Sequence, residues 1–261
     1  MKRPDSGARR RKTSWENVAG WYQNYMGSEG GDFQREIVFP GALRLLDPKA
    51  GGHYLDIACG QGAFAKLIAQ KTHGQVVGID ASATLIEAAK RKAPATCRFL
   101  VSDAANFGGK FDRESFHGAA CLLAIQNIDR IEPVFAQAVA TLKPGAPFVI
   151  VMNHPCFRQP RQSGWGWDEE RKLQYRRVDR YMTTYEMPIL AHPGSAPQVK
   201  TYSYHRPLTD YVAALAKSGF AIDALEEWVS NKKSDSGPRA KAENVAREEI
   251  PMFLAIRARK Y

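Results

Sequence analysis

Short apolar runs alternate with stretches of helical periodicity from residue 53 to residue 153. This alternation is typical of βαβ units and predicts a parallel sheet covered by helices. The hydroxyl of Ser82 is expected to cap the second helix. The predicted strands are 53–59, 74–80, 97–103, 117–126 and 147–153, and the predicted helices are 62–72, 83–92 and 132–142.

The segments on either side of this repeat extend the same domain. Aromatic residues at helical spacing predict a helix over 15–26, and a helix over 32–46 is expected to break at Pro40. A later helix is predicted over 208–219 with Thr209 as its N-cap. The remaining predicted elements are strands over 220–228 and 251–259, within one domain that covers 15–261.

A long insertion, residues 154–207, interrupts the repeat after the fifth strand. Acids early and bases late in 168–182 suit the helix dipole and predict a helix there. Residues 183–190 and 198–205 are predicted as two strands of a hairpin. An insertion of this size is more often a lid or a binding region than a simple connection, so we expect it to lie over a site.

Composition narrows the class of protein. The chain has 261 residues with 44% hydrophobic side chains, and it contains no apolar run near the roughly 18 residues of a membrane span. Its first residues are basic but no apolar stretch follows them, so a signal peptide is not expected and a cytoplasmic location is the default. The four cysteines show no C-x-x-C spacing, so neither a metal site nor disulfides are expected.

Half of the net charge of +10 lies in residues 1–14, which hold six basic residues and one acid. A segment so poor in apolar residues is predicted to be disordered. A solvated tail is the simpler interpretation, and a weak tether to RNA or to a membrane is the alternative.

The stretch LDIACGQGAFAKLIAQ, residues 55–70, marks a ligand site. Gly60 and Gly62 permit a tight turn and a close approach of the backbone, and Ala65 permits close packing of helix on strand. Asp80 ends the second strand, twenty residues after Gly60, where its carboxylate can accept hydrogen bonds from ribose hydroxyls. Together these features indicate a cofactor that contains adenosine.

Asp56 distinguishes between two such cofactors. A carboxylate four residues before Gly60 would repel the pyrophosphate of NAD. S-adenosylmethionine has no phosphate, and its ammonium and sulfonium groups are cations that an acid attracts. The residues therefore favour S-adenosylmethionine, with S-adenosylhomocysteine as its product.

At this point the sequence resembles the class I S-adenosylmethionine-dependent methyltransferases, most closely the UbiE-like, type 11 group. The resemblance is carried by LDIACGQG at 55–62, by Asp80, by the pair at 102–103, by LLAIQNI at 122–128 and by LKPG at 142–145. It implies an α/β, doubly wound, seven-stranded Rossmann-like sheet whose last strand is antiparallel. The cofactor-binding residues it suggests are Tyr25, Asp56, Ala58, Gly60, Gly62, Asp80, Ala81, Ser82, Asp103, Ala104, Ala124 and Gln126.

Candidates for the acceptor side follow the fifth strand, because ligands bind at the carboxyl edge of open α/β sheets. His154 is the first candidate for a general base and His205 is the second, since histidine titrates near neutral pH. Arginines there could clamp an anion, and tryptophans could form an apolar wall. The candidate substrate-binding residues are Tyr22, Asn153, Arg158, Trp165, Trp167, Tyr204 and Arg206.

The sequence thus predicts a methyltransferase that acts at oxygen, nitrogen or carbon of an aromatic or anionic small molecule. The basic surface and tail leave an RNA methyltransferase as an alternative. A protein that binds S-adenosylmethionine without catalysis is a third possibility, because the motifs of the family do not fix a catalytic base.

Overall fold

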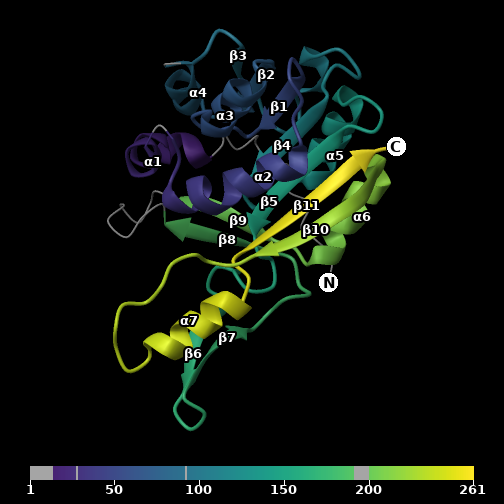
Figure 1. Cartoon of the computed structure of the whole chain (residues 1–261). Coiled ribbons are helices and arrows are strands. Elements are labelled where there is room, and N and C mark those ends of the chain that lie inside the picture. Colours follow the sequence, from purple (N-terminus) through teal and green to yellow (C-terminus); the bar gives the residue numbers. More distant parts are fainter. Residues whose placement is uncertain (1–13, 28, 92, 191–199) are drawn as a thin grey trace.

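A computed structural model of the chain describes residues 14–27, 29–91, 93–190 and 200–261 (Figure 1). The tail predicted to be disordered lies, except for its last residue, outside the described residues. So does the connection at 191–199.

Seven strands form one sheet in the order β10-β11-β5-β4-β1-β2-β3. The strands from β1 to β5 pair in parallel, whereas β11 runs antiparallel to both β5 and β10. The predicted seven-stranded sheet with an antiparallel last strand is therefore confirmed. The bounds are β1 His53–Ile57, β2 Gln75–Asp80, β3 Cys97–Val101, β4 Gly118–Leu122, β5 Pro147–Asn153, β10 Phe220–Trp228 and β11 Phe253–Lys260.

Helices cover both faces of the sheet, as the long apolar strands require. On one face the core gathers around Phe135 and Phe148, and on the other around Phe64 and Phe99. Side chains alternate along each strand, so Leu55 faces the first core and Tyr54 the second. The main helices are α2 Phe39–Leu46, α3 Ala63–Thr72, α4 Ala83–Lys90, α5 Ile131–Thr141 and α6 Leu208–Ser218.

The N-terminal residues form η1 (Ser14–Val18) and α1 (Ala19–Met26), which lie beside α4 (Figure 1). The predicted helix break at Pro40 is wrong. A π-helical turn, η2 (Gln34–Val38), leads directly into α2 and places Pro40 near its start, where a missing N–H costs little. Ser82 caps α4 as predicted, since its hydroxyl accepts from the Leu85 N–H at 3.2 Å.

The helix predicted over 168–182 is also wrong. The segment instead forms a hairpin of β6 (Ser163–Asp168) and β7 (Leu173–Val178). The Asp168 carboxylate accepts from the Arg171 N–H at 2.8 Å, and Lys172 completes the turn at a φ of 51°. An aspartate that caps an N–H group three residues later is common to helix starts and turns, so its position alone does not decide between them.

The insertion forms two hairpins in two places (Figure 1). The predicted strands β8 (Tyr185–Leu190) and β9 (Lys200–His205) are present, and β9 contacts η1 and η4 (Ile125–Asn127) beside the end of β4. By contrast, β7 packs with α7 (Ala240–Glu249), and the hairpin of β6 and β7 extends away from the sheet. We call β6, β7 and α7 the projection.

Three smaller observations complete the fold. Helix α6 begins at Leu208 after Pro207, so Thr209 lies inside the helix and is not its cap. All four cysteines are free thiols. Within the described ranges, no helix combines the length and the apolar character that a membrane span requires, and no cluster of His, Cys, Asp and Glu side chains could hold a metal ion.

Candidate functional site

The turn between β1 and α3 lies at the carboxyl edge of the sheet. Three of its residues have left-handed backbone conformations. The φ angles are 57° at Ala58, 56° at Gly60 and 77° at Gly62. A Cβ atom on Gly62 would lie 2.5 Å from the Phe99 ring, so only glycine fits there. Leu123, just after β4, has a φ of 54° and is strained in the same way as Ala58.

Asp80 ties the end of β2 to this turn. One carboxylate oxygen accepts from the Gly60 N–H at 2.9 Å, and the other accepts from the Ser82 N–H at 2.8 Å. Burial raises the pKa of Asp80, and these two hydrogen bonds oppose that effect. A carboxylate oxygen has two lone pairs, so each oxygen can still accept from a hydroxyl of a ligand.

Two buried acceptors at this edge have no hydrogen-bond partner among the described residues. They are Oδ2 of Asp56 at the end of β1, and Oε1 of Gln126 just beyond β4. Burial raises the pKa of Asp56 to about 8. The amide of Gln126 is held by a 2.9 Å bond from its Nε2 to the Leu123 carbonyl. Unsatisfied buried polar atoms are costly, so a ligand that donates to these two acceptors would stabilise the edge. Trp167 Nε1 and Gln174 Oε1 in the projection are unpaired in the same way.

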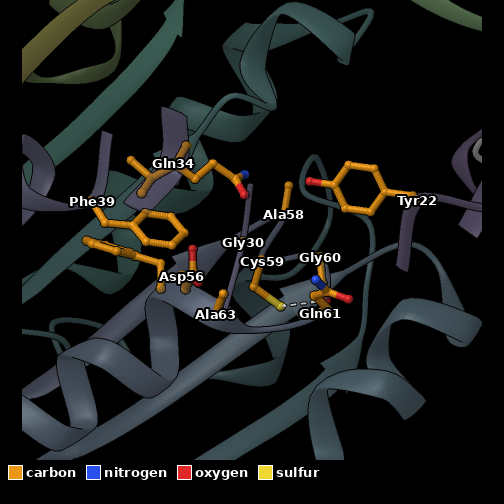
Figure 2. Close-up of a pocket in the computed structure, with 12 residues that line it drawn as sticks. Tyr22, Gly30, Gln34, Phe39, Asp56, Ala58, Cys59, Gly60, Gln61 and Ala63 are labelled. Atoms are coloured by element: carbon orange, nitrogen blue, oxygen red, sulfur yellow. Dashed lines mark hydrogen bonds between the residues drawn. The ribbon is translucent and has the colours of Figure 1, made fainter. Parts of the chain in front are cut away.

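A cavity of about 50 Å³ lies in front of Asp56 (Figure 2). Tyr22 of α1 and Gln34 of η2 both line it. Burial raises the pKa of the Tyr22 phenol and of the Cys59 thiol, so both groups are neutral. The lining consists of Tyr22, Gly30, Gln34, Phe39, Asp56, Ala58, Cys59, Gly60, Gln61, Ala63, Phe64 and Leu122.

The N-terminal segment covers the cavity and is fastened to the sheet edge. The Glu16 carboxylate accepts from the hydroxyls of Ser82 and Thr84, the latter at 2.7 Å. Gln23 donates to the Thr84 carbonyl at 3.2 Å, and Gln61 donates to the Gly27 carbonyl. A carboxylate at the N-terminus of α4 is favoured by the helix dipole.

The predicted cofactor residues converge on this edge, with one exception. Asp103 and Ala104 follow β3, and the exposed Asp103 carboxylate accepts from the Ala105 N–H at 2.8 Å. The exception is Tyr25, which is 71% exposed and stacks on Trp21 with ring centroids 5.1 Å apart.

Of the predicted cofactor residues, Asp56, Ala58 and Gly60 line the cavity itself. Gln34 and Phe39 also line the cavity, but they belong to none of the sequence motifs and were not predicted.

The structure does not support His154 as a general base. Its Nδ1 accepts from the Cys156 N–H at 3.2 Å, so Nε2 carries the proton and donates to Glu227 at 2.7 Å. Burial lowers the pKa of the imidazole, while Glu227 raises it. Both nitrogens are thus engaged within the protein, and the ring lies outside the residues that line the cavity.

His205 is also held away from the cavity. Its Nε2 donates to the Tyr181 carbonyl at 2.6 Å, and its ring stacks on Tyr185 with centroids 4.8 Å apart. Burial lowers its pKa. The catalytic role of His205 stays a prediction. Its Nε2 carries the proton in this bond, so a base would use Nδ1, and the ring does not line the cavity.

Of the other acceptor-side candidates, Tyr22 lines the cavity, and the rest separate into two groups. Trp165 and Trp167 lie in the projection, where Arg158 faces Trp165 at 5.1 Å and Arg239 faces Trp167 at 4.6 Å. Arg158 also donates to the Pro251 carbonyl at 3.3 Å, so none of these side chains reaches the cavity.

The second group stays near the sheet edge. Arg206 donates to the Ile128 carbonyl at 3.0 Å beside the Tyr204 ring. This bond joins β9 to the segment after β4. Asn153 is exposed at the end of β5.

Comparisons of sequence agree with this geometry. Residues 55–145 match a family described as a methyltransferase domain. The chain is 33% identical over 123 residues to the O-methyltransferase cnsE of Penicillium expansum, covering 44% of each protein. It is 32% identical over 130 residues to the 2-phytyl-1,4-naphtoquinone methyltransferase of Synechococcus elongatus, covering 46% of this chain and 56% of that protein. The chain thus spans about half the length of these curated relatives.

Comparisons of structure cover more of the chain. An S-adenosylmethionine-dependent methyltransferase from Mesorhizobium loti matches with a TM-score of 0.67 and 27% identity, over 85% of this chain and 96% of that one. The cyclase SpnF matches with a TM-score of 0.62 and 14% identity, over 95% and 97% of the two chains. The similarity to SpnF shows the fold alone, because one fold can carry out several chemistries.

Proposed function

We propose that this chain, whose core is a class I methyltransferase domain, transfers a methyl group from S-adenosylmethionine to a small organic acceptor. The observation that carries the proposal is the pair of buried acceptors, Asp56 Oδ2 and Gln126 Oε1, which lack donors at the carboxyl edge of the sheet. They lie at the ends of the two neighbouring strands β1 and β4, where open α/β sheets bind ligands.

Asp56 fits the methionine end of this cofactor. S-adenosylmethionine supplies a methyl group already activated on a sulfonium, and it also carries an α-ammonium group. An ammonium donor would satisfy Asp56 Oδ2 and stabilise its ionised form, whereas the pyrophosphate of a dinucleotide would be repelled. The Oε1 atom of Gln126 would accept from a second donor of the same cationic end.

The opposite wall of the cavity offers donors. The neutral Tyr22 phenol is hydrogen-bonded to the Gln34 side chain, and the hydrogens that this pair does not use are donors for a ligand. Gln34 Oε1 is occupied by the Gly31 N–H at 3.1 Å, which orients the amide. We assign Tyr22 and Gln34 to the carboxylate of the methionine end, across the cavity from Asp56.

The adenosine end would be held by the turn residues and by the ends of β2 and β3. Asp80 is oriented by two backbone N–H groups and would accept from the ribose hydroxyls. Gly60 and Gly62 let the backbone approach the ligand. Asp103 would accept from the adenine amino group.

For the acceptor we propose a small molecule that needs no strong base. The described residues that line the cavity include no histidine or lysine, and both candidate histidines are engaged elsewhere. Positioning therefore has to supply most of the rate, which suits an amine, a phenolate or a stabilised carbanion. Two of the relatives are named as methyltransferases of a phytyl naphthoquinone and of a methylenesterol, which supports an apolar acceptor.

Two measurements test the proposal. Calorimetric titration of the full chain with S-adenosylhomocysteine should show saturable binding, and the absence of binding would overturn the assignment of the cofactor. Incubation with S-adenosylmethionine labelled on the methyl group and with a metabolite extract, with and without ribonuclease, should label a small-molecule fraction. Label that disappears with ribonuclease would point to RNA instead, and binding without any transfer would indicate a non-catalytic protein.

A further inference from the structure

A second cavity, of about 360 Å³, lies at the amino edge of the sheet, opposite the site described above. Its volume falls in the range of small-molecule pockets. It is formed where α2 ends and where β1, β4 and β5 begin. The lining consists of Leu46, Asp47, Lys49, Ala50, Gly51, Gly52, Tyr54, His117, Pro147 and Arg259.

Two donors face each other at the wall of this cavity. His117 Nδ1 accepts from the His53 N–H at 3.0 Å, so a neutral His117 carries its proton on Nε2. That Nε2 lies 2.8 Å from Nζ of Lys143, which is an ammonium group. An N–H and an ammonium cannot satisfy each other, whereas an anionic oxygen could accept from both.

The surroundings of this contact are positively charged. Lys49, Arg257 and Arg259 add three cations, and Asp47 and Asp223 are the acids that face them. Hydrogen bonding to Lys49 holds the pKa of Asp47 below its usual value, and the charges of Lys71 and Arg257 add to that effect.

The ion pair of Lys49 with Asp47 is weakly held. It spans 2.5 Å, but the two side chains are 74% and 66% exposed. Exposed pairs contribute little free energy. The Lys49 ammonium can therefore exchange this partner for a bound anion.

The rest of the cavity is apolar. Leu46, Pro147 and the Tyr54 ring contribute hydrocarbon surface, and the Tyr54 hydroxyl is occupied by the Lys49 N–H at 2.6 Å. We propose that the amino-edge cavity binds an organic anion, a phosphate monoester with an apolar body, whose phosphate lies against His117, Lys143 and Lys49. A phosphate oxygen would supply the acceptor that is missing from the contact of His117 with Lys143, and Lys49 would exchange Asp47 for it.

This second site is spatially separate from the first. Helix α2 has Phe39 at the cavity of the carboxyl edge and Leu46 at the cavity of the amino edge. Strand β1 likewise places Asp56 in the first cavity and Tyr54 in the second. A ligand at the amino edge therefore leaves the proposed cofactor site accessible, and its binding does not depend on the proposed function.

The test uses phenyl phosphate as the probe, with the full chain and with matched variants. Nuclear magnetic resonance of the histidine rings should show saturable shifts of the His117 signals on titration with phenyl phosphate. Lys143→Ala should weaken binding about tenfold, the loss expected for one charge-assisted hydrogen bond. Lys241→Ala removes an exposed lysine of the projection and should bind as the natural chain does. The thermal unfolding temperatures of both variants should match that of the natural chain, which shows that they are folded.

Phenol serves as the probe without a phosphate and should bind much more weakly than phenyl phosphate. Equal affinity of the two probes would overturn the proposal, because the cavity would then recognise only the ring. An unchanged affinity in Lys143→Ala would overturn it too, as would the absence of saturable shifts.

Discussion

The two edges of the sheet differ in their titratable side chains, which are acids at the carboxyl edge and mainly bases at the amino edge, and they are built in different ways. At the carboxyl edge, Asp56 is buried and Asp80 is partly buried beside the N-terminal segment, and Asp80 is fixed by backbone N–H groups. At the amino edge, Lys49 and Arg259 are exposed to water and are held by other side chains. The carboxyl edge is suited to a cationic ligand that is held in one defined geometry. The amino edge is suited to an anion that is bound by flexible side chains.

This difference follows from the direction of the strands. The backbone turns sharply where each strand passes into its helix, so the N–H groups of the turns lie at the carboxyl edge and orient the acids there. The amino edge receives the chain from the ends of helices and from loops, and its charges lie on long flexible side chains. We therefore expect substitutions at the first edge to have large effects and those at the second to have small ones.

The largest effect is expected for Gly62→Ala at the carboxyl edge, with Gly51→Ala at the amino edge as its counterpart. Both glycines have left-handed φ angles, 77° and 69°, but only a Cβ added to Gly62 would meet the Phe99 ring, at 2.5 Å. Gly51→Ala should cost about 1 kcal/mol of unfolding free energy for its φ alone. Gly62→Ala should cost about 3 kcal/mol or more, because overpacking is added. Urea unfolding measures both, and equal losses would contradict the contrast.

Asp80→Ala should come next. It removes the acceptor proposed for the ribose and leaves the N–H groups of Gly60 and Ser82 without a partner. Affinity for S-adenosylhomocysteine should fall about 100-fold, as for two lost hydrogen bonds to a charged group. Calorimetry measures this, with the exposed Asp235→Ala as the control. Near-normal affinity in Asp80→Ala would show that the ligand binds elsewhere.

The pH dependence of cofactor binding should reveal Asp56. Its pKa of about 8 in the empty site means that it is mostly protonated at pH 7. A cationic ligand favours the ionised form, so binding should release a proton, and affinity should rise with pH by up to about tenfold per unit below pH 8. Calorimetry in buffers of different ionisation enthalpy measures the proton. In Asp56→Asn this proton release should disappear, and only the pH dependence that comes from the titration of the ligand's own groups should remain.

The same group sets a trend in the stability of the empty protein. The folded pKa of Asp56 lies above its ordinary value of 3.8, so the unfolded state ionises first as pH rises. Stability is therefore lost between about pH 4 and pH 8. Asp56→Asn should remove this loss, which thermal unfolding across that pH range would show.

The smallest effect is expected for Lys49→Ala at the amino edge. Its ion pair with Asp47 is exposed, so the unfolding free energy should change by less than about 0.5 kcal/mol. Thermal unfolding at low and high salt measures it. A loss above about 1 kcal/mol would mean that the charges of this edge contribute substantially to the stability of the fold.

Much of the carboxyl edge could be predicted from the sequence because its signals are local. Gly60, Gly62 and Asp80 act through the backbone of the strand and turn in which they stand. Their types and spacing therefore indicate their roles. The alternation of strands and helices likewise predicted the sheet, whose register depends on apolar faces that each strand displays by itself.

The acceptor side could not be predicted as well because its partners are distant in sequence. The setting of His154 depends on Glu227, which is 73 residues away on β10. Trp167 is held by Arg239, next to the start of α7. The hairpin turn at Asp168 uses the same capping bond as a helix start, and Lys172 rather than glycine takes the left-handed position. No local pattern could distinguish these cases.

The left-handed conformations of Ala58 and Leu123 have a consequence for how this protein could change. A side chain in that conformation costs about 1 kcal/mol or more, and glycine relieves it. Ala58 lines the cavity, and Leu123 follows Leu122, which also lines it. Substitutions to glycine beside the site could therefore raise the stability of the protein. Variants that alter ligand choice usually lose stability, and glycine at either position could restore part of it during laboratory evolution.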